Sequence, residues 1–176
     1  EGLCCGSVSQ RAFMQYTTSS IAFASLDQMF AALRNILDKA AAHAKTAGVD
    51  DAVYTSWRLA PDMFTMARQV QIACDIAVRG MTRLSGGEPP SFPDAETTFA
   101  QLKERAAKAH AHIKDLDRAK IDADPDNDIT VPMRDTSMTL KRRQFLQNFL
   151  LPNVHFHVTA AYLNLRNAGV PLGKAD

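Results

Sequence analysis

The chain has 176 residues, 46% of them hydrophobic and 22% charged, and a formal net charge of +1 at pH 7. This length and composition are typical of one globular domain that buries a sizeable core. The balanced charge argues against a dedicated nucleic-acid-binding protein, and no apolar run approaches the roughly 20 residues that cross a bilayer. We therefore expect neither nucleic acid nor a membrane as a partner.

The three cysteines are too few and too poorly spaced to form a disulfide framework. Cys74 falls on an apolar helical stripe and is interpreted as a small core residue. These features indicate a reducing, cytoplasmic location. Residues 1–18 carry neither a helical period nor a signal-peptide core. We expect them to be a poorly ordered tail or a segment left from cloning, outside a domain of residues 19–176.

Apolar residues at helical spacing predict two long helices in the first half of the domain. The first is expected at about 21–47, with Ser19 or Ser20 as its N-cap and Gly48 after its end. The second is expected to begin at Pro61, a residue that is favoured at the first helical position, and to end at Gly86.

Two further helices are predicted after the turn-rich linker EPPSFPD. Asp94 is a suitable N-cap for the third helix, and the fourth is expected at about 142–167. Pro152 lies inside the fourth helix and removes a backbone donor, so we expect a kink there or two helices that meet end to end.

Between the third and fourth helices the apolar period changes to alternation. Ile129, Val131 and Met133 alternate with other residues, as do Met138 and Leu140, which predicts a short β-hairpin. Four amphipathic helices can bury their stripes only against one another. The sequence therefore predicts an all-α fold, an up-and-down style four-helix bundle with a β-hairpin before the last helix.

Two polar residues mark the apolar face of the last helix. Asn153 and His157 are four residues apart, about 40° around the helix axis, so they can point at one object. His155 is about 200° away from His157, so the two imidazoles cannot bind one metal ion from a regular helix.

A second group of polar residues interrupts the apolar stripe of the second helix. Gln71 lies on that stripe, with Arg68 three residues before it and Asp75 four residues after it. Because a buried amide needs partners, we expect Gln71 to face Asn153 and His157 and to form a small polar pocket with them.

Each candidate also has a structural interpretation. His157 could be a core histidine with one hydrogen bond, and Asn153 could cap the half-helix that follows Pro152. Arg68 and Asp75 could form an ordinary salt bridge. These alternatives stay open at the level of the sequence.

Four segments in combination carry a family resemblance: RLAPDMFTMARQVQIACD, PPSFPDAETTFAQLKER, ITVPM with SMTLKRRQFL, and LPNVHFHVTAAYLNLRNAGVPLGKAD. They resemble a bacterial group of small proteins within the DinB/YfiT-like superfamily, known only as a domain of unknown function. The resemblance covers about residues 21–176 and implies a DinB-like four-helix bundle. Because such bundles are often dimeric, it also implies a homodimer.

The resemblance has consequences for metal binding. Members of the wider superfamily typically bind a divalent transition metal through three histidines, one on the second helix and an HxxxH pair on the last, and some are metal-dependent thiol transferases. The pair would fall on Asn153 and His157, of which only His157 matches. The second helix has no histidine between Pro61 and Gly86. The resemblance therefore implies a degenerate metal site.

Three functions follow as hypotheses. The first is a module that binds a small polar ligand through His157, Asn153 and Gln71, with Arg68 and Asp75 beside them. The second is a metal-dependent transferase of the thiol-transfer type, with His157 as the anchor for a divalent metal and an altered ligand set. The third is a purely structural homodimer. The sequence leaves open whether the chain is an enzyme.

Overall fold

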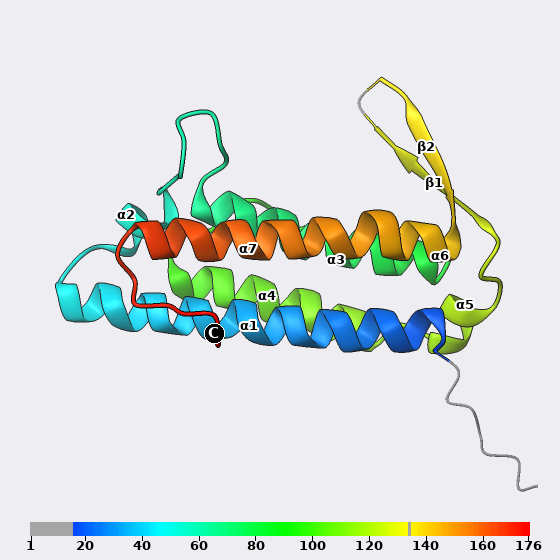
Figure 1. Cartoon of the computed structure of the whole chain (residues 1–176), viewed down its shortest axis with the longest axis horizontal. Coiled ribbons are helices and arrows are strands. Elements are labelled where there is room, and N and C mark those ends of the chain that lie inside the picture. Colours follow the sequence, from blue (N-terminus) through cyan, green and yellow to red (C-terminus); the bar gives the residue numbers. More distant parts are fainter. Residues whose placement is uncertain (1–15, 134) are drawn as a thin grey trace, which may run out of the picture.

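The computed structural model describes residues 16–133 and 135–176, which form a four-helix bundle with a projecting β-hairpin (Figure 1). The long helices are α1 (Thr18–Ala47), α3 (Met66–Leu84), α4 (Phe99–Lys114) and α7 (Leu151–Asn167). The short elements are α2 (Asp51–Thr55), α5 (Arg118–Asp122), β1 (Asp128–Pro132), β2 (Ser137–Lys141), α6 (Arg142–Gln144) and the π-helical segment η1 (Phe145–Leu150). The predicted fold class is confirmed. None of the helices within the described ranges is long and apolar enough to cross a membrane.

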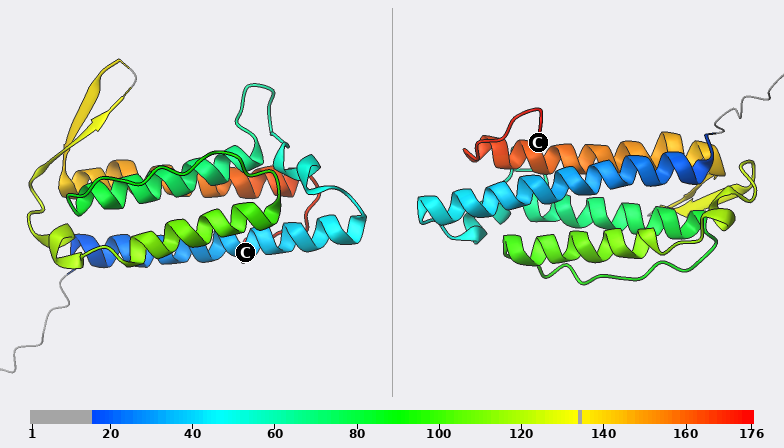
Figure 2. Two further views of the ribbon diagram at one scale, coloured as in Figure 1. Left: turned by 180° about the vertical axis from the view of Figure 1, so that it is seen from behind. Right: turned by 90° about the horizontal axis from the view of Figure 1, so that it is seen from below.

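The order of the helices around the bundle is α1, α4, α3, α7, because α1 and α3 each pack mainly against α4 and α7. The linker 85–98 returns along the length of the bundle, so α3 and α4 run in the same direction (Figure 2). The chain direction is therefore up, down, down, up, which corrects the simple up-and-down expectation. The cause is the linker, whose three prolines favour an extended backbone.

The start of α1 differs slightly from the prediction. Thr17 is the N-cap, and it forms a reciprocal capping box with Ser20. Gly48 ends the helix in a left-handed conformation, as expected. Residues 1–15 of the predicted tail lie outside the described residues.

The predicted starts of the second and third helices are wrong. Helix α3 begins at Met66 with Thr65 as its N-cap, and Pro61 lies in an irregular connection before it. Helix α4 begins at Phe99 with Thr98 as its N-cap. Asp94 cannot serve as that cap because its carboxylate is bonded to Arg105 and Arg68.

The last helical run covers residues 142–167, as predicted, and passes through α6, η1 and α7 without interruption. Pro152 has no N–H to donate, and its ring would clash with the carbonyl four residues back. The chain accommodates it with the π-helical segment, in which the N–H of Leu151 donates to the carbonyl oxygen of Leu146. Of the two expectations for Pro152, a kink or two helices that meet end to end, the second is wrong because the helical run is continuous.

The hairpin is also as predicted. Strands β1 and β2 are antiparallel, with Ile129 opposite Leu140 and Val131 opposite Met138. Ile129 and Val131 are buried and belong to the same core as the helices, whose largest fully buried side chains include Phe30, Phe99 and Phe145. Figure 1 shows that the strands stand away from the side of the bundle, near the end where α6 begins.

Candidate functional site

His157 lies on the buried side of α7, and 9% of its surface is exposed. Its Nδ1 is 2.7 Å from Oε1 of Gln69 on α3. An amide oxygen only accepts, so Nδ1 carries the proton and donates it to Gln69. This hydrogen bond joins two helices and fixes the orientation of the imidazole ring.

The other ring nitrogen of His157 is available to a ligand. Its Nε2 makes no hydrogen bond with the residues that the structure describes, and it is not one of their enclosed unpaired atoms, so solvent reaches it. Burial lowers the pKa of His157, and the positive charge of Arg68 lowers it further. The ring is therefore neutral at pH 7, with an acceptor lone pair on Nε2.

Asn153 lies one turn before His157 but its amide nitrogen is already engaged. The Nδ2 donates to the carbonyl oxygen of Phe149 at 2.6 Å, within the same helical run. Phe149 belongs to the π-helical segment that Pro152 imposes. Asn153 is therefore not the cap of a half-helix, because its side chain donates to a carbonyl and α7 has no side-chain cap.

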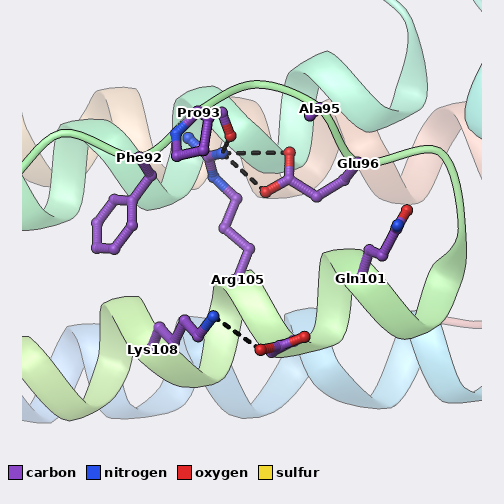
Figure 3. Close-up of a pocket in the computed structure, with 8 residues that line it drawn as sticks. Phe92, Pro93, Ala95, Glu96, Gln101, Arg105 and Lys108 are labelled. Carbon is purple, nitrogen blue, oxygen red and sulfur yellow. Dashed lines mark hydrogen bonds and ion pairs between the residues drawn. The ribbon is translucent and has the colours of Figure 1, made fainter.

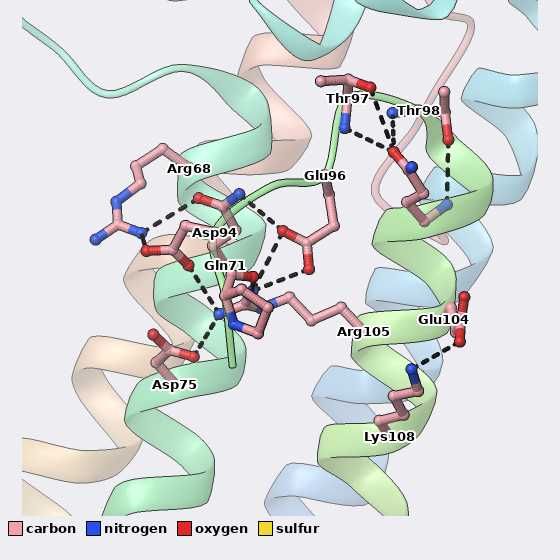
Figure 4. A network of polar contacts seen from close by, with 12 residues as sticks. Arg68, Gln71, Asp75, Asp94, Glu96, Thr97, Thr98, Glu104, Arg105 and Lys108 are labelled. Carbon is pink, nitrogen blue, oxygen red and sulfur yellow. Dashed lines mark hydrogen bonds and ion pairs between the residues drawn. The ribbon is translucent and has the colours of Figure 1, made fainter. Parts of the chain in front are cut away.

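Arg68, Gln71 and Asp75 belong to a separate polar network, which we call the Arg105 cluster (Figure 4). Its members are Arg68, Gln71, Asp75, Asp94, Glu96 and Arg105. The guanidinium of Arg105 is at its centre. Its Nη2 is 2.6 Å from Oδ1 of Asp75 and 3.0 Å from Oδ1 of Asp94. Its Nη1 is 2.9 Å from Oε1 of Glu96.

The remaining members close the cluster. Nε2 of Gln71 donates to Oε2 of Glu96 at 2.9 Å, and Oε1 of Gln71 accepts from Arg68 at 3.2 Å. Arg68 also forms an ion pair with Asp94. The cluster therefore fastens the linker 85–98 to α3 and α4.

Arg105 stays charged in this environment although its side chain is only 1% exposed. Burial acts to lower its pKa, but hydrogen bonds with Glu96 and Asp75 outweigh burial and raise it. A buried cation with three carboxylate partners is costly to disturb, because losing it would leave those carboxylates without compensation.

A shallow pocket of about 200 Å³ lies beside the Arg105 cluster, between the linker and α4 (Figure 3). Figure 3 shows the side chains of Phe92, Gln101 and Lys108 around the stem of Arg105. The Nζ of Lys108 is 2.7 Å from Oε1 of Glu104, so the charges in its wall are paired with each other. None of the residues predicted as site residues lines this pocket.

The structure does not bring the predicted pocket together. Gln71 faces the linker and α4, whereas the residue that meets His157 is Gln69. The two glutamines are about 200° apart around α3. The prediction was wrong because it assumed one buried stripe on this helix, while α3 packs against α4 on one side and α7 on the other.

Gln69 and Arg105 were not predicted as site residues, although each lies at a position of the sequence that indicates burial. Gln69 lies three residues after Met66 and four before Ala73, which are both buried. Arg105 lies three residues after Leu102 and four before Ala109 on the apolar stripe of α4. Polar side chains at such positions are buried and need partners, so both positions could have been identified.

The donor atoms around His157 do not fit the three-histidine metal site of the superfamily. Asn153 stands in place of one histidine, and its amide nitrogen is engaged by its own helix. The oxygen of Gln69 is engaged by His157 itself. Within residues 16–133 and 135–176, no three histidine, cysteine, aspartate or glutamate side chains are grouped to hold a metal ion. Transition metals prefer imidazole and thiolate over amide oxygens.

Cys74 does not supply a reactive thiol. It is fully buried in the core, as predicted, and burial raises the pKa of its thiol to about 12. A thiol with such a pKa carries almost no thiolate at neutral pH and is a poor nucleophile.

The arrangement of the helices is shared with a solved structure. The crystal structure of a DinB family member protein from Shewanella denitrificans is 36% identical to this chain, with a TM-score of 0.81. The match covers 89% of this chain and 88% of that chain. The helical fold and this likeness thus define a DinB-like helical protein.

The family assignment is more specific. The family described as "Domain of unknown function (DUF1993)" matches residues 19–176, and the chain belongs to this family. No curated protein matches the chain.

Proposed function

We propose that this protein binds a small molecule at His157 and does so without a resident transition metal. The observation that carries the proposal is the state of this imidazole. Gln69 fixes the proton on Nδ1, and Nε2 is left as a neutral acceptor that solvent reaches. A fixed acceptor at the edge of an apolar interior is typical of the few polar groups that orient a ligand.

The surroundings of His157 indicate the chemistry of the ligand. The ring of Phe156 meets the imidazole edge-on, with 5.1 Å between the ring centroids, and 59% of Phe156 is exposed. Phe156, rather than His157 itself, lines an apolar hollow of about 280 Å³ together with Leu59, Met63, His155 and Leu163. A ligand with an apolar body and one N–H or O–H donor fits these neighbours.

Charge narrows the class of ligand further. Arg68 is close enough to lower the pKa of His157, so its positive charge acts at the site. A cationic ligand would be repelled by Arg68, and a carboxylate, which only accepts hydrogen bonds, has no donor for the lone pair on Nε2. Neutral alcohols, phenols and amides are therefore the expected ligands.

A thermal-shift screen with small phenols, aliphatic alcohols and primary amides tests the proposal. A compound at 100 times its dissociation constant stabilises the protein by about 2.7 kcal/mol, which gives a clear rise in Tm. His157→Ala should abolish that rise. His112→Ala is the matched control, because His112 lies on α4, where its Nε2 is 2.9 Å from Oγ1 of Thr82, and it does not line the hollow. Equal stabilisation of wild type and His157→Ala, or no stabilisation by any of these compounds, would contradict the proposal.

A homodimer is the second candidate, favoured by the exposed apolar side chains near this hollow. Phe156 is 59% exposed, and Leu59 and Leu163 are also exposed. Clustered apolar side chains of this kind mark interaction surfaces as well as ligand sites. Sedimentation velocity separates the candidates, since a dimer that dissociates in a Phe156→Ser, Leu163→Ser double variant would assign the hollow to a second copy.

A further inference from the structure

A second apolar groove lies between α1, α7 and the C-terminal segment 168–176, and it shares Thr159 with the hollow beside Phe156. Its volume is about 390 Å³, within the lower part of the roughly 300–1,000 Å³ range of small-molecule sites. Met29, Ala32 and Ile36 of α1 and Val158 of α7 supply apolar walls. None of the residues that line it belongs to the His157–Gln69 pair or to the Arg105 cluster.

The groove is preformed because the C-terminal segment is held against α1. Val170 and Leu172 are buried and anchor the segment. The carboxylate of Asp176 forms an ion pair with Lys39 and accepts a hydrogen bond from Nδ2 of Asn35 at 3.2 Å. The segment therefore forms a fixed lip, which spares a ligand the cost of ordering it.

The rim of the groove carries polar groups without partners among the described residues. Lys174, Tyr162 and Thr159 all line the groove, and their side chains make no hydrogen bond or ion pair within ranges 16–133 and 135–176. Asp176 also lines the rim, but Lys39 compensates its negative charge. The uncompensated charge at the rim is the ammonium of Lys174.

We propose that this groove binds a small amphipathic carboxylate. The apolar body lies on the floor formed by α1 and α7, and the carboxylate meets Lys174, with the hydroxyls of Tyr162 and Thr159 as additional donors. An apolar groove with a single uncompensated cation at its edge matches a molecule with one apolar body and one anionic head. This proposal does not rest on the function proposed for His157, although Thr159 lines both the groove and the hollow beside Phe156.

Calorimetric titration of the full chain with octanoate tests the proposal, with octanol as the neutral analogue. Octanoate should bind with a stoichiometry of one, and more tightly than octanol. Ala32→Trp fills the groove and should abolish binding. Lys174→Gln should weaken octanoate roughly fivefold, as expected for a partly exposed ion pair, and leave octanol unchanged. Lys45→Gln is the matched control, because it removes one exposed lysine from α1 outside the groove and should change neither ligand.

The outcomes distinguish the alternatives. No saturable binding of octanoate to the wild type, or equal weakening by Lys174→Gln and Lys45→Gln, would overturn the proposal. If Ala32→Trp does not fold, the charge variants still decide. Dissociation of a dimer by Ala32→Trp in sedimentation would show that a second copy covers the groove, which also overturns the proposal. His157→Ala should leave octanoate binding intact, so this site and the His157 site can fail separately.

Discussion

At the scale of single residues, the bond between His157 and Gln69 is the most informative contact. It joins α3 to α7, places the ring proton on Nδ1 and leaves Nε2 open to solvent. A core histidine with a single hydrogen bond was one of the interpretations that the sequence left open. The structure contains that single hydrogen bond. It also leaves Nε2 accessible to solvent, which a purely structural histidine does not need.

The lowered pKa of His157 predicts a pH dependence of stability. The unfolded chain has the ordinary histidine pKa of 6.5, and the native pKa is lower. Below pH 6.5 the unfolded chain therefore binds more protons than the native protein. The free energy of unfolding consequently decreases as the pH is lowered. The slope is at most about 1.4 kcal/mol per pH unit for one proton.

Urea unfolding at several pH values measures this slope, and His157→Asn should remove it. His155→Asn is the control and should keep it. The carboxylates of Asp27, Asp122 and Asp176 have lowered pKa values. Their contribution to the stability of the fold is therefore lost only when the pH falls through 3.8 and below. An unchanged slope in His157→Asn would mean that another group titrates in this window.

The second residue-scale prediction concerns Arg105. Arg105→Met leaves Asp75, Asp94 and Glu96 without their shared cation and should lower the free energy of unfolding by about 3–5 kcal/mol. Lys103→Met, on the same helix, breaks only the exposed ion pair with Asp38 and should cost less than about 1 kcal/mol. Similar losses in the two variants, measured by urea unfolding, would show that the Arg105 cluster contributes little.

At the scale of elements, the π-helical segment packs closely on α3. Gly80 of α3 faces Leu150, and a Cβ added at Gly80 would lie well inside contact distance of the Leu150 side chain. Leu150 is fully buried, and Gly80 is also buried. The absence of a side chain at Gly80 therefore sets how near α3 and η1 can approach.

Gly80→Leu should destabilise the protein by about 2–3 kcal/mol, because a larger side chain cannot enter this contact without moving the helices. Ala107→Leu, at an exposed position on α4, should change stability by less than about 0.5 kcal/mol. Chemical unfolding of both variants measures the difference. A Gly80→Leu variant as stable as Ala107→Leu would contradict the close approach.

The sequence predicted elements where local signals agree with tertiary packing. The run 142–167 and the hairpin were identified because their apolar patterns are long or strictly alternating. The sequence-based prediction of a helix start was wrong where a residue that suits that position has another structural role. Asp94 has the chemistry of an N-cap but serves Arg105, and Pro61 suits a first turn but lies in an irregular connection.

At the scale of the whole molecule, the predicted bundle is confirmed but its chain direction could not be derived from the pattern. Nothing in the apolar stripes states that the linker 85–98 returns along the bundle, and the contacts that hold it there come from Asp94 and Glu96. For the same reason, the pattern could not show that Gln71 and His157 face different neighbours. The homodimer and the cytoplasmic location stay predictions.

The donor set predicts the metal content of the whole protein. Untagged protein that is equilibrated with zinc and then dialysed should retain less than about 0.1 equivalents, because the described residues hold no group of three histidine, cysteine, aspartate or glutamate side chains that could bind a metal. Atomic-emission analysis measures the retained metal. Introducing a second imidazole with Asn153→His should raise zinc retention, and a stoichiometric zinc ion in the unaltered protein would contradict the account.

The most direct test of the central claim is the ¹⁵N NMR spectrum of the His157 ring at pH 7. The account predicts a neutral imidazole with its proton on Nδ1, and it predicts that Gln69→Leu removes this preference. A proton on Nε2, or a doubly protonated ring at that pH, would contradict it.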